Sequence, residues 1–410
     1  MRRFRSFIAV CLPALIFILT SGPCPAAESS DRSWSEIVSA ARGQTVDWFM
    51  WGGWPETNAY VTGFVADEMA ARYGVRVRQV PVRDIAEVVG RLLVEKQAGK
   101  TSGGEADLLW INGENFRTAK AHGLLYGPFA DRLPHTRLVD WDRPSVKTDF
   151  GVPVEGMESP WGSAQIVFIY DTKRTPDPPG TLCELLDWIR AHPGRFAYPA
   201  PPDFTGSAFV RQVFYHVAGP DRQWTGKIDQ AAFDRAAKTT FKILREIAPA
   251  LWREGKTYPE SPVRVSRLFA DGEVDFSMSY HPAEASKKIH DGLFPDTVRT
   301  FVLDGGTLAN THFVAIPFNA ADREGAMVLA DFLLSPEAQL KKADPRIWGD
   351  LPAIDLDRLD PEWQQRFADL PRGVATLSPA TLQAHRIPEL PSELLVALER
   401  GWERHVLKGR

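Results

Sequence analysis

The sequence predicts an α/β protein with two lobes that are connected by two crossings of the chain. Strand-like and helix-like segments alternate through the first part of the chain, an order typical of parallel sheets covered by helices. A long apolar strand at residues 164–170 interrupts this alternation, and a return strand follows at residues 313–317. The chain has 410 residues, which is enough for two lobes with a large combined core.

The first α/β unit is predicted from three pairs of a strand and a helix within residues 45–163. Its predicted strands are 45–50, 75–80 and 107–111, and its predicted helices are 58–72, 86–96 and 116–122. The first helix has apolar side chains at the spacing of one helical face, and Gly74 is the kind of residue that commonly ends a helix.

The second α/β unit is predicted within residues 164–312 and begins with the crossing strand. Its strands are predicted at 164–170, 196–198, 275–279 and 300–303, and its helices at 181–191, 207–218, 261–270 and 283–291, with further helices within 228–253. After the return strand, a helix is predicted at 324–334. Ser335 and Pro336 then predict the start of another helix, because serine caps helices and proline suits the first helical position.

These elements define the domain boundaries that we expect. Lobe one comprises residues 45–163 plus 313–345, and lobe two comprises residues 164–312. Residues 346–410 contain short helical segments between Pro-rich turns, which predicts a C-terminal helical extension that packs on the lobes. The two crossings would act as hinges, and the cleft between the lobes would be the natural ligand site.

The first residues have the three parts of a secretory signal peptide. Arg2, Arg3 and Arg5 give a positive start, residues 7–20 are almost wholly apolar, and small residues follow. This apolar run is shorter than the about 20 residues that span a bilayer, which favours a cleaved signal peptide. An uncleaved membrane anchor is the alternative. We therefore predict that residues 1–27 are removed and that the protein is exported to the periplasm.

Charge and cysteine content narrow the class of protein further. Residues 28–410 carry 45 basic and 52 acidic side chains, which is a net charge of −7 with neutral histidines. This balance argues against nucleic acid as a partner, because binding to nucleic acid needs a basic surface. Cys183 is the one cysteine beyond the predicted signal peptide, so we predict no internal disulfide and a thiol buried on its helix. We expect a monomer.

Several stretches of the chain carry a resemblance to a known family. They are Phe49–Gly53, Glu105–Trp110, Trp161–Ala164, Ile169–Lys173, Phe269–Asp275 and Ala330–Gln339. In this order, over residues 45–345, they resemble the solute-binding proteins of ABC importers, in the family that handles thiamine, polyamines, iron, phosphonates and sugars. The resemblance implies a two-lobed periplasmic-binding-protein-like fold, a small-molecule ligand and an ABC-type membrane permease as partner. It implies no enzyme and no cofactor, and the little-characterised branch that the chain most resembles does not indicate the ligand.

Ligands of open parallel sheets bind beyond the carboxyl ends of the strands, where helices begin. Five loops of this chain fit that description, and a further residue borders the return strand. The candidate ligand-binding residues are Trp51, Gly52, Gly53, Trp54 and Glu56 in the first loop; Trp110, Asn112, Glu114 and Asn115 in the second; Trp161 in the third; Phe204, Thr205 and Ser207 in the fourth; Tyr280 in the fifth; and Asn310 beside the return strand.

Each candidate also has a purely structural interpretation. The glycines let backbone approach a ligand and the tryptophans are suited to stacking, but a tryptophan in such a loop can equally pack in the core. Asn112 and the Thr205 to Ser207 segment are expected either to contact ligand or to cap helices. Trp161 is predicted to lie in a Pro-Trp-Gly turn and to form a wall of the site.

The composition of these loops predicts the charge of the ligand. Tryptophan and tyrosine dominate, Glu56, Glu114 and Glu158 add negative charge, and arginine and lysine are scarce. Aromatic faces and carboxylates attract cations, so we predict an organic cation, with a neutral sugar as the second choice. No partner at metal-ligand spacing accompanies His281, and no metal site is predicted.

An enzyme is the main alternative to a binding protein. The sequence has neither the Gly-x-Ser-x-Gly elbow of serine hydrolases nor the His-Glu-x-x-His of zinc proteases. Gly99-Lys100-Thr101 lacks the glycine that a phosphate-binding loop needs, and the aspartates at 355–360 lack the glycine and glutamate of a calcium loop. We therefore predict a binding protein that closes about its hinges. The alternative is a secreted hydrolase with a non-standard active site.

Overall fold

The structure is a computed structural model that describes residues 32–219, 224 and 228–409. The predicted signal peptide, residues 1–27, lies outside the described residues. Trp34–Arg410 form one compact unit. No helix within the described ranges combines the length and the apolar character needed to cross a bilayer.

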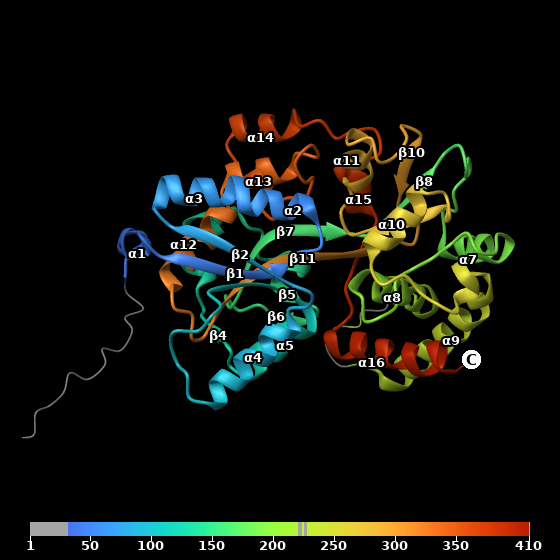
Figure 1. The fold of residues 1–410 in the computed structure, drawn as a ribbon, viewed down its shortest axis with the longest axis horizontal. Coiled ribbons are helices and arrows are strands. Elements are labelled where there is room, and N and C mark those ends of the chain that lie inside the picture. The colour runs from blue at the N-terminus through green and yellow to red at the C-terminus, as the bar shows by residue number, and fades with distance from the viewer. Residues whose placement is uncertain (1–31, 220–223, 225–227, 410) are drawn as a thin grey trace, which may run out of the picture. The chain divides into compact units, whose positions relative to one another are not determined.

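The larger of two main sheets carries the first predicted unit. Strands β1 (Thr45–Trp51), β2 (Arg76–Val82) and β3 (Leu108–Ile111) are parallel, in the order β3-β1-β2. Helices α2 (Pro55–Ala59) and α3 (Ala66–Tyr73), joined by a π-helical turn at Tyr60–Val65, lie on one side of these strands, and α4 (Ala86–Gln97) and α5 (Gly113–Ala121) lie on the other (Figure 1). The predicted alternation of strands and helices is therefore confirmed here.

The smaller sheet carries the second predicted unit. Its strands β8 (Val167–Asp171), β9 (Phe276–Ser279) and β10 (Val298–Phe301) pair antiparallel in the order β10-β8-β9. The accompanying helices are α7 (Leu182–Ala191), α8 (Phe204–Ala218), α9 (Gln230–Ile247), α10 (Pro262–Ala270) and α11 (Glu284–His290).

Two long strands carry the chain between these sheets. Strand β7 (Ser159–Gln165) pairs antiparallel with β11 (Thr307–Pro317), and the two run side by side in Figure 1. The chain leaves β7 at Ile166 and enters β8, so the predicted single strand at 164–170 is in fact the end of one strand and the start of another. The return strand is longer than the predicted 313–317, because all 11 residues of β11 are buried and paired.

Shorter elements complete the large sheet and its surroundings. They are α1 (Trp34–Ala41), β4 (Leu125–Tyr126), α6 (Pro144–Lys147), β5 (Thr148–Asp149), β6 (Val152–Pro153), α12 (Arg323–Leu333), α13 (Pro336–Ala343), α14 (Pro361–Ala368), α15 (Pro379–Ala384), β12 (Arg386–Pro388) and α16 (Ser392–Trp402). The predicted helix start at Ser335 is confirmed, since the Ser335 hydroxyl accepts a hydrogen bond from the Ala338 amide at 3.2 Å.

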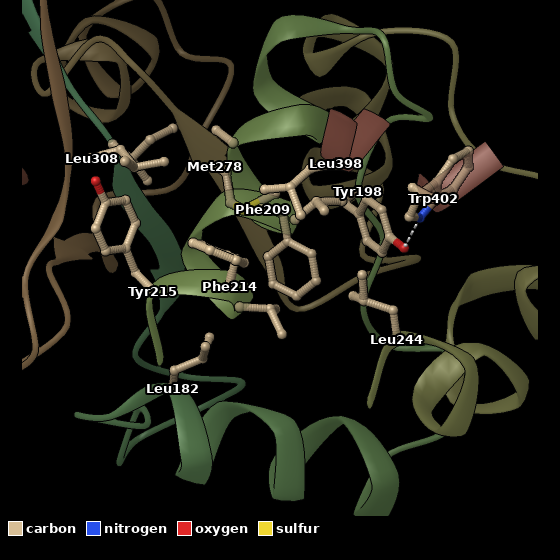
Figure 2. Packing of buried hydrophobic residues seen from close by; sticks show 14 of the residues in the cluster. Leu182, Tyr198, Phe209, Phe214, Tyr215, Leu244, Met278, Leu308, Leu398 and Trp402 are labelled. Atoms are coloured by element: carbon tan, nitrogen blue, oxygen red, sulfur yellow. Dashed lines mark hydrogen bonds between the residues drawn. The ribbon is translucent and has the colours of Figure 1, made fainter. Parts of the chain in front are cut away.

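The C-terminal segment is held by its last helix. Leu394, Leu398 and Trp402 share one face of α16 and join the apolar core that α8 and α9 form beside the smaller sheet (Figure 2). The Trp402 indole N–H donates to the Tyr198 hydroxyl at 3.0 Å. Helix α16 also contacts α5, so it touches helices from both predicted units.

Two predictions about the second unit are wrong. Residues 196–198 are not a strand: Phe196 and Tyr198 are buried, but the segment pairs with no sheet strand, and the Phe196 carbonyl accepts from the Trp252 amide at 2.8 Å. Cys183 is exposed instead of buried. Its neighbours Leu182 and Leu185 occupy the buried face of α7, which turns position 183 toward solvent.

Candidate functional site

A buried ion pair lies at the centre of a polar cluster beside the return strand. Arg211 of α8 is fully buried, and its Nε donates to Glu389 Oε2 at 2.9 Å. Its two terminal nitrogens donate to the Ser207 hydroxyl at 2.6 Å and to the Tyr280 hydroxyl at 3.0 Å. Tyr280 donates in turn to Glu389 Oε1 at 2.6 Å, and the Asn310 amide donates to the same oxygen at 3.2 Å. We call these five residues the Arg211 cluster.

The cluster compensates its own buried charge. Burial alone would lower the pKa of Arg211, but Glu389 and Tyr280 hold it above its usual value. Burial, and then Glu389, raise the pKa of Tyr280, so Tyr280 stays a neutral donor. The sequence predicted Ser207, Tyr280 and Asn310 as site residues, and the structure brings these three together. It did not indicate Arg211 or Glu389, which lie inside a helix and after a short C-terminal strand.

Further carboxyl groups surround this cluster. Burial raises the pKa of Glu399 to about 7 and also raises the pKa of Glu114. Asp149 accepts from the Gly113 amide at 2.7 Å, yet burial raises its pKa well above the usual range. Glu158 is fully buried, neither of its oxygens has a hydrogen-bond partner among the described residues, and burial followed by Asp149 raises its pKa. Each of these acids resists ionisation because the cost of burying its charge outweighs the effect of the cations and donors near it among the described residues.

A cavity of about 670 Å³ adjoins the Arg211 cluster and has the size of a site for a small solute. Both signs of charge occur in its wall. The lining residues are Arg143, Pro144, Ser145, Thr148, Asp149, Phe150, Gly151, Tyr215, Trp224, Ala309, Asn310, Thr311, Gln383, Arg386, Ile387, Pro388 and Glu389. Asn310 is the one predicted site residue in this wall, because the segments at 143–151 and 383–389 carry no motif that sequence analysis could single out.

Arg386 is the least compensated charge of this cavity. Its guanidinium donates to the Ser163 hydroxyl at 3.1 Å, and no carboxylate of the described residues lies within ion-pair distance of it. Burial, and then the nearby charge of Arg143, lower the pKa of Arg386 to about 10. Arg143 itself has a single long contact, 3.8 Å to Asp140. The two arginines therefore present positive charge to the cavity.

The fourth predicted loop offers an aromatic ring to a ligand, whereas its backbone amides already have partners. Phe204 is partly exposed, and its ring centre is 4.9 Å from that of Tyr280 and 6.1 Å from that of Phe150. Asp203 caps the start of α8 by accepting from the Thr205 amide at 3.0 Å and the Gly206 amide at 2.9 Å. The capping interpretation thus accounts for the amides of this helix start.

The second predicted loop lies at the start of α5. Asn112 occupies the position before the helix but makes no side-chain capping bond, and Asn115 is half-buried in the first turn. Glu114 is half-buried, and its pKa also responds to the charge of Arg211. This loop therefore extends toward the Arg211 cluster from the larger sheet.

The first predicted loop contacts a different region. A side chain at Gly53 would lie 2.1 Å from the Trp51 ring, and one at Gly52 would lie 2.6 Å from Pro81, so both positions require glycine. The Trp51 and Trp54 rings meet edge to face at 5.9 Å. Trp54 also meets His281 at 5.5 Å. Glu56 lies beside them at a cavity of only about 10 Å³, which is too small for an organic solute.

Trp161 lies inside strand β7, and the predicted Pro-Trp-Gly turn is wrong. Its ring is fully buried between the rings of Trp48 at 5.0 Å, Trp110 at 5.0 Å and Trp348 at 5.3 Å. Only Trp110 of this group is half-buried, with its ring 5.0 Å from that of His312. Trp161 therefore has no face that a ligand can reach in this structure.

Beside these tryptophans lies a second polar cluster, His281, His312, Lys342 and Asp350, which we call the His312 cluster. Asp350 accepts from Lys342 Nζ at 2.7 Å, and both side chains are fully buried. Burial lowers the pKa of His312. Burial alone would raise the pKa of Asp350, but Lys342 and then His312 hold it below its usual range. Sequence analysis found no partner for His281, because the other members of this cluster lie on distant segments of the chain.

Comparison with known proteins identifies a family and a fold. Residues 65–368 match the model of the family described as bacterial extracellular solute-binding protein. Protein YnjB of Escherichia coli strain K12 is 43% identical over 326 residues, which are 80% of this chain and 84% of YnjB.

Solved structures resemble this one at low sequence identity. A periplasmic thiamin binding protein matches with a TM-score of 0.58 and 17% identity, over 88% of this chain and 96% of its own. A putative spermidine/putrescine ABC transporter protein from Listeria monocytogenes matches with a TM-score of 0.61 and 14% identity, over 88% and 98%. These likenesses show a shared α/β architecture, that of periplasmic binding proteins.

Proposed function

Because the chain belongs to the bacterial extracellular solute-binding protein family, we propose that it binds a small organic cation that also carries an anionic group. Membership in this family makes it the solute-binding protein of an ABC transporter and not an enzyme, which sets aside the alternative of a secreted hydrolase. The observation that carries the proposal about the solute is the cavity of about 670 Å³, whose wall holds Arg143 and Arg386 together with the carboxyl group of Asp149.

The acidic groups favour a cation. Asp149 lines the cavity, and two further carboxyl groups interact with it electrostatically. In addition to burial, Glu114 raises the pKa of Asp149, and Asp149 raises the pKa of Glu158. A bound ammonium or similar cation would stabilise the ionised form of Asp149, which burial now disfavours. The aromatic side chain of Phe150 in the same wall is suited to contact with a cation.

The arginines favour an anionic group on the same solute. Arg386 and Arg143 both line the cavity; Arg386 has no carboxylate within ion-pair distance among the described residues, and Arg143 has one long contact, 3.8 Å to Asp140. A guanidinium prefers the paired geometry of a carboxylate or phosphate oxygen pair. The solute class that fits both halves of the wall is therefore a zwitterion, such as a betaine, an amino acid or a phosphorylated amine.

Closure about the two crossing strands is the mechanism that we propose. The cavity wall includes residues of β11, of α8 beside the smaller sheet and of the 143–151 segment beside the larger sheet. A solute that contacts all three favours the arrangement in which they are close, and so shifts a pre-existing equilibrium. The closed form is the form that the membrane permease is expected to recognise.

Calorimetry with a panel of solutes tests this proposal. We expect zwitterions to bind more tightly than purely cationic amines, and purely anionic compounds to bind weakly. Asp149→Asn should weaken binding of zwitterions and amines alike, whereas Arg386→Gln should weaken binding of zwitterions only. Arg190→Gln, an exposed change on α7, is the control. Tight binding of a dianion or a neutral sugar, with no binding of any amine or zwitterion, would contradict the proposal.

A further inference from the structure

We propose that His281, His312 and Asp350 bind one divalent transition-metal ion. His281 follows β9, His312 lies in β11, and Asp350 follows α13, so the donors come from three separate parts of the chain. Each residue offers one donor atom, and all three atoms lie within 4.8 Å of one another.

Two of the three separations between the donor atoms are those of ligands around a single ion, and the third, between the two histidines, is within 4.8 Å. The His312 Nε2 to Asp350 Oδ1 distance is 3.3 Å, and the His281 Nδ1 to Asp350 Oδ1 distance is 3.7 Å. Nitrogen and oxygen ligands at about 2.0–2.2 Å from a tetrahedral zinc ion lie about 3.4 Å from each other. The cluster therefore needs little rearrangement to accept an ion.

These same donor atoms lack other partners. His281 Nδ1, His312 Nε2 and Asp350 Oδ1 are all buried, and none has a hydrogen bond in the described part of the chain. The three residues are 7%, 6% and 1% exposed. Buried polar atoms are almost always satisfied, and three unsatisfied atoms within 4.8 Å of one another indicate a shared partner.

A second set of contacts orients the carboxylate. Lys342 Nζ donates to the other oxygen, Asp350 Oδ2, at 2.7 Å and to the Leu351 carbonyl at 3.0 Å. Asp350 Oδ1 is thereby left for the ion, in the way that outer contacts orient metal-ligating carboxylates. Because the ammonium of Lys342 offsets the charge of Asp350, we expect a weaker site than one built from several thiolates.

The donor types and the surroundings define the class of ion and its route of entry. Two imidazoles and one carboxylate suit zinc, iron(II), cobalt or nickel, whereas calcium and magnesium prefer oxygen ligands. Asp350 borders a cavity of about 480 Å³, which is the route of entry that we infer for the ion. None of the three donors lines the cavity proposed for the organic solute, so the metal site is separate from it.

Metal titration of the full exported chain tests this proposal. After treatment with a chelator, we expect calorimetry to show one zinc ion bound per chain, and cobalt to give visible absorption bands typical of nitrogen and oxygen ligands. His281→Gln and Asp350→Asn should each weaken zinc binding by about 100-fold or more. His290→Gln, which changes an exposed histidine on α11, should leave zinc binding unchanged.

Thermal melts without metal separate loss of the site from loss of the fold. His281→Gln is the most informative variant, because His281 follows a strand and does not lie within one, and its metal-free melting temperature should stay near that of the unchanged protein. Zinc should raise the melting temperature of the unchanged protein and of His290→Gln but not of His281→Gln. The absence of zinc and cobalt binding, or a zinc affinity of folded His281→Gln and Asp350→Asn equal to that of the unchanged protein, would overturn the proposal.

Discussion

Side chains that are far apart in the sequence form hydrogen bonds and ion pairs with each other in this protein. Arg211 and Glu389 are separated by 178 residues, yet they form a fully buried ion pair with Tyr280 as a shared partner. Such a pair gives little net stability over an apolar substitute, but leaving one member alone is costly because a charge is then buried without compensation. This asymmetry makes the Arg211 cluster a suitable place to test the energetics of the site.

Arg211→Met should destabilise the protein by about 3–5 kcal/mol, because Glu389 would stay buried without its partner. The double variant Arg211→Met with Glu389→Leu should recover much of that loss, since no buried charge remains. Urea unfolding measures both effects, with Arg190→Met as an exposed control. A loss below about 0.5 kcal/mol for Arg211→Met would show that the pair is not buried as described.

Glu399 gives a prediction about pH, because burial raises its pKa to about 7. The unfolded chain releases this proton near pH 4.5, whereas the folded protein keeps it until about pH 7. Between these values the folded state binds more protons, so the contribution of Glu399 to stability falls as pH rises and stays low above pH 7. Glu399→Gln should therefore gain stability relative to the unchanged protein on going from pH 4.5 to pH 8, by on the order of 1–3 kcal/mol. Equal stability differences at both pH values, measured by urea unfolding, would argue against a buried Glu399.

At the scale of elements, helix starts and strand ends decide which side chains reach the cavity. Helix α8 begins at the Asp203 cap, which places Phe204 and Ser207 at its first turn and Arg211 one turn further on the same side. Helix α16 packs against α8 and contacts α5, so the C-terminal segment fixes one wall of the region. The position of the site thus depends on elements that follow the return strand as well as on those before it.

Asp203→Ala should destabilise the protein by about 1 kcal/mol, because the amides of Thr205 and Gly206 would lose their cap. The same change should weaken solute binding, since the first turn of α8 carries Phe204 and Ser207. Asp187→Ala, on the exposed surface of α7, is the matched control for the unfolding measurement. Unchanged stability in Asp203→Ala would mean that the cap contributes nothing to the helix.

At the scale of the whole molecule, two sheets are connected by the paired strands β7 and β11. Trp54 after β1 and His281 after β9 are in contact, so loops that follow strands of the two sheets meet in this structure. A binding protein of this family is expected to separate and rejoin such loops as solute is released and bound.

Trp54→Ala should shift the solute-free protein toward a more open form, because this contact between the loops is lost. Small-angle X-ray scattering should then give a larger radius of gyration than for the unchanged protein, and saturating solute should reduce the difference. Trp363→Ala, which changes a tryptophan on α14, serves as the control. Identical scattering from both variants and the unchanged protein would exclude a role of Trp54 in closure.

The sequence by itself determined the α/β alternation, the two crossings and the family, because apolar periodicity and short local motifs depend only on neighbours in the chain. It also predicted Ser207, Tyr280 and Asn310 as candidates from their places at strand ends and helix starts, and the structure brings them together in the Arg211 cluster. Only the tertiary structure decided that Arg211 meets Glu389, that the predicted Trp161 wall is core, and that His281, His312 and Asp350 converge. The physical reason is that a local pattern specifies which face of an element is buried, whereas the partner of a buried charge is set by how distant elements pack.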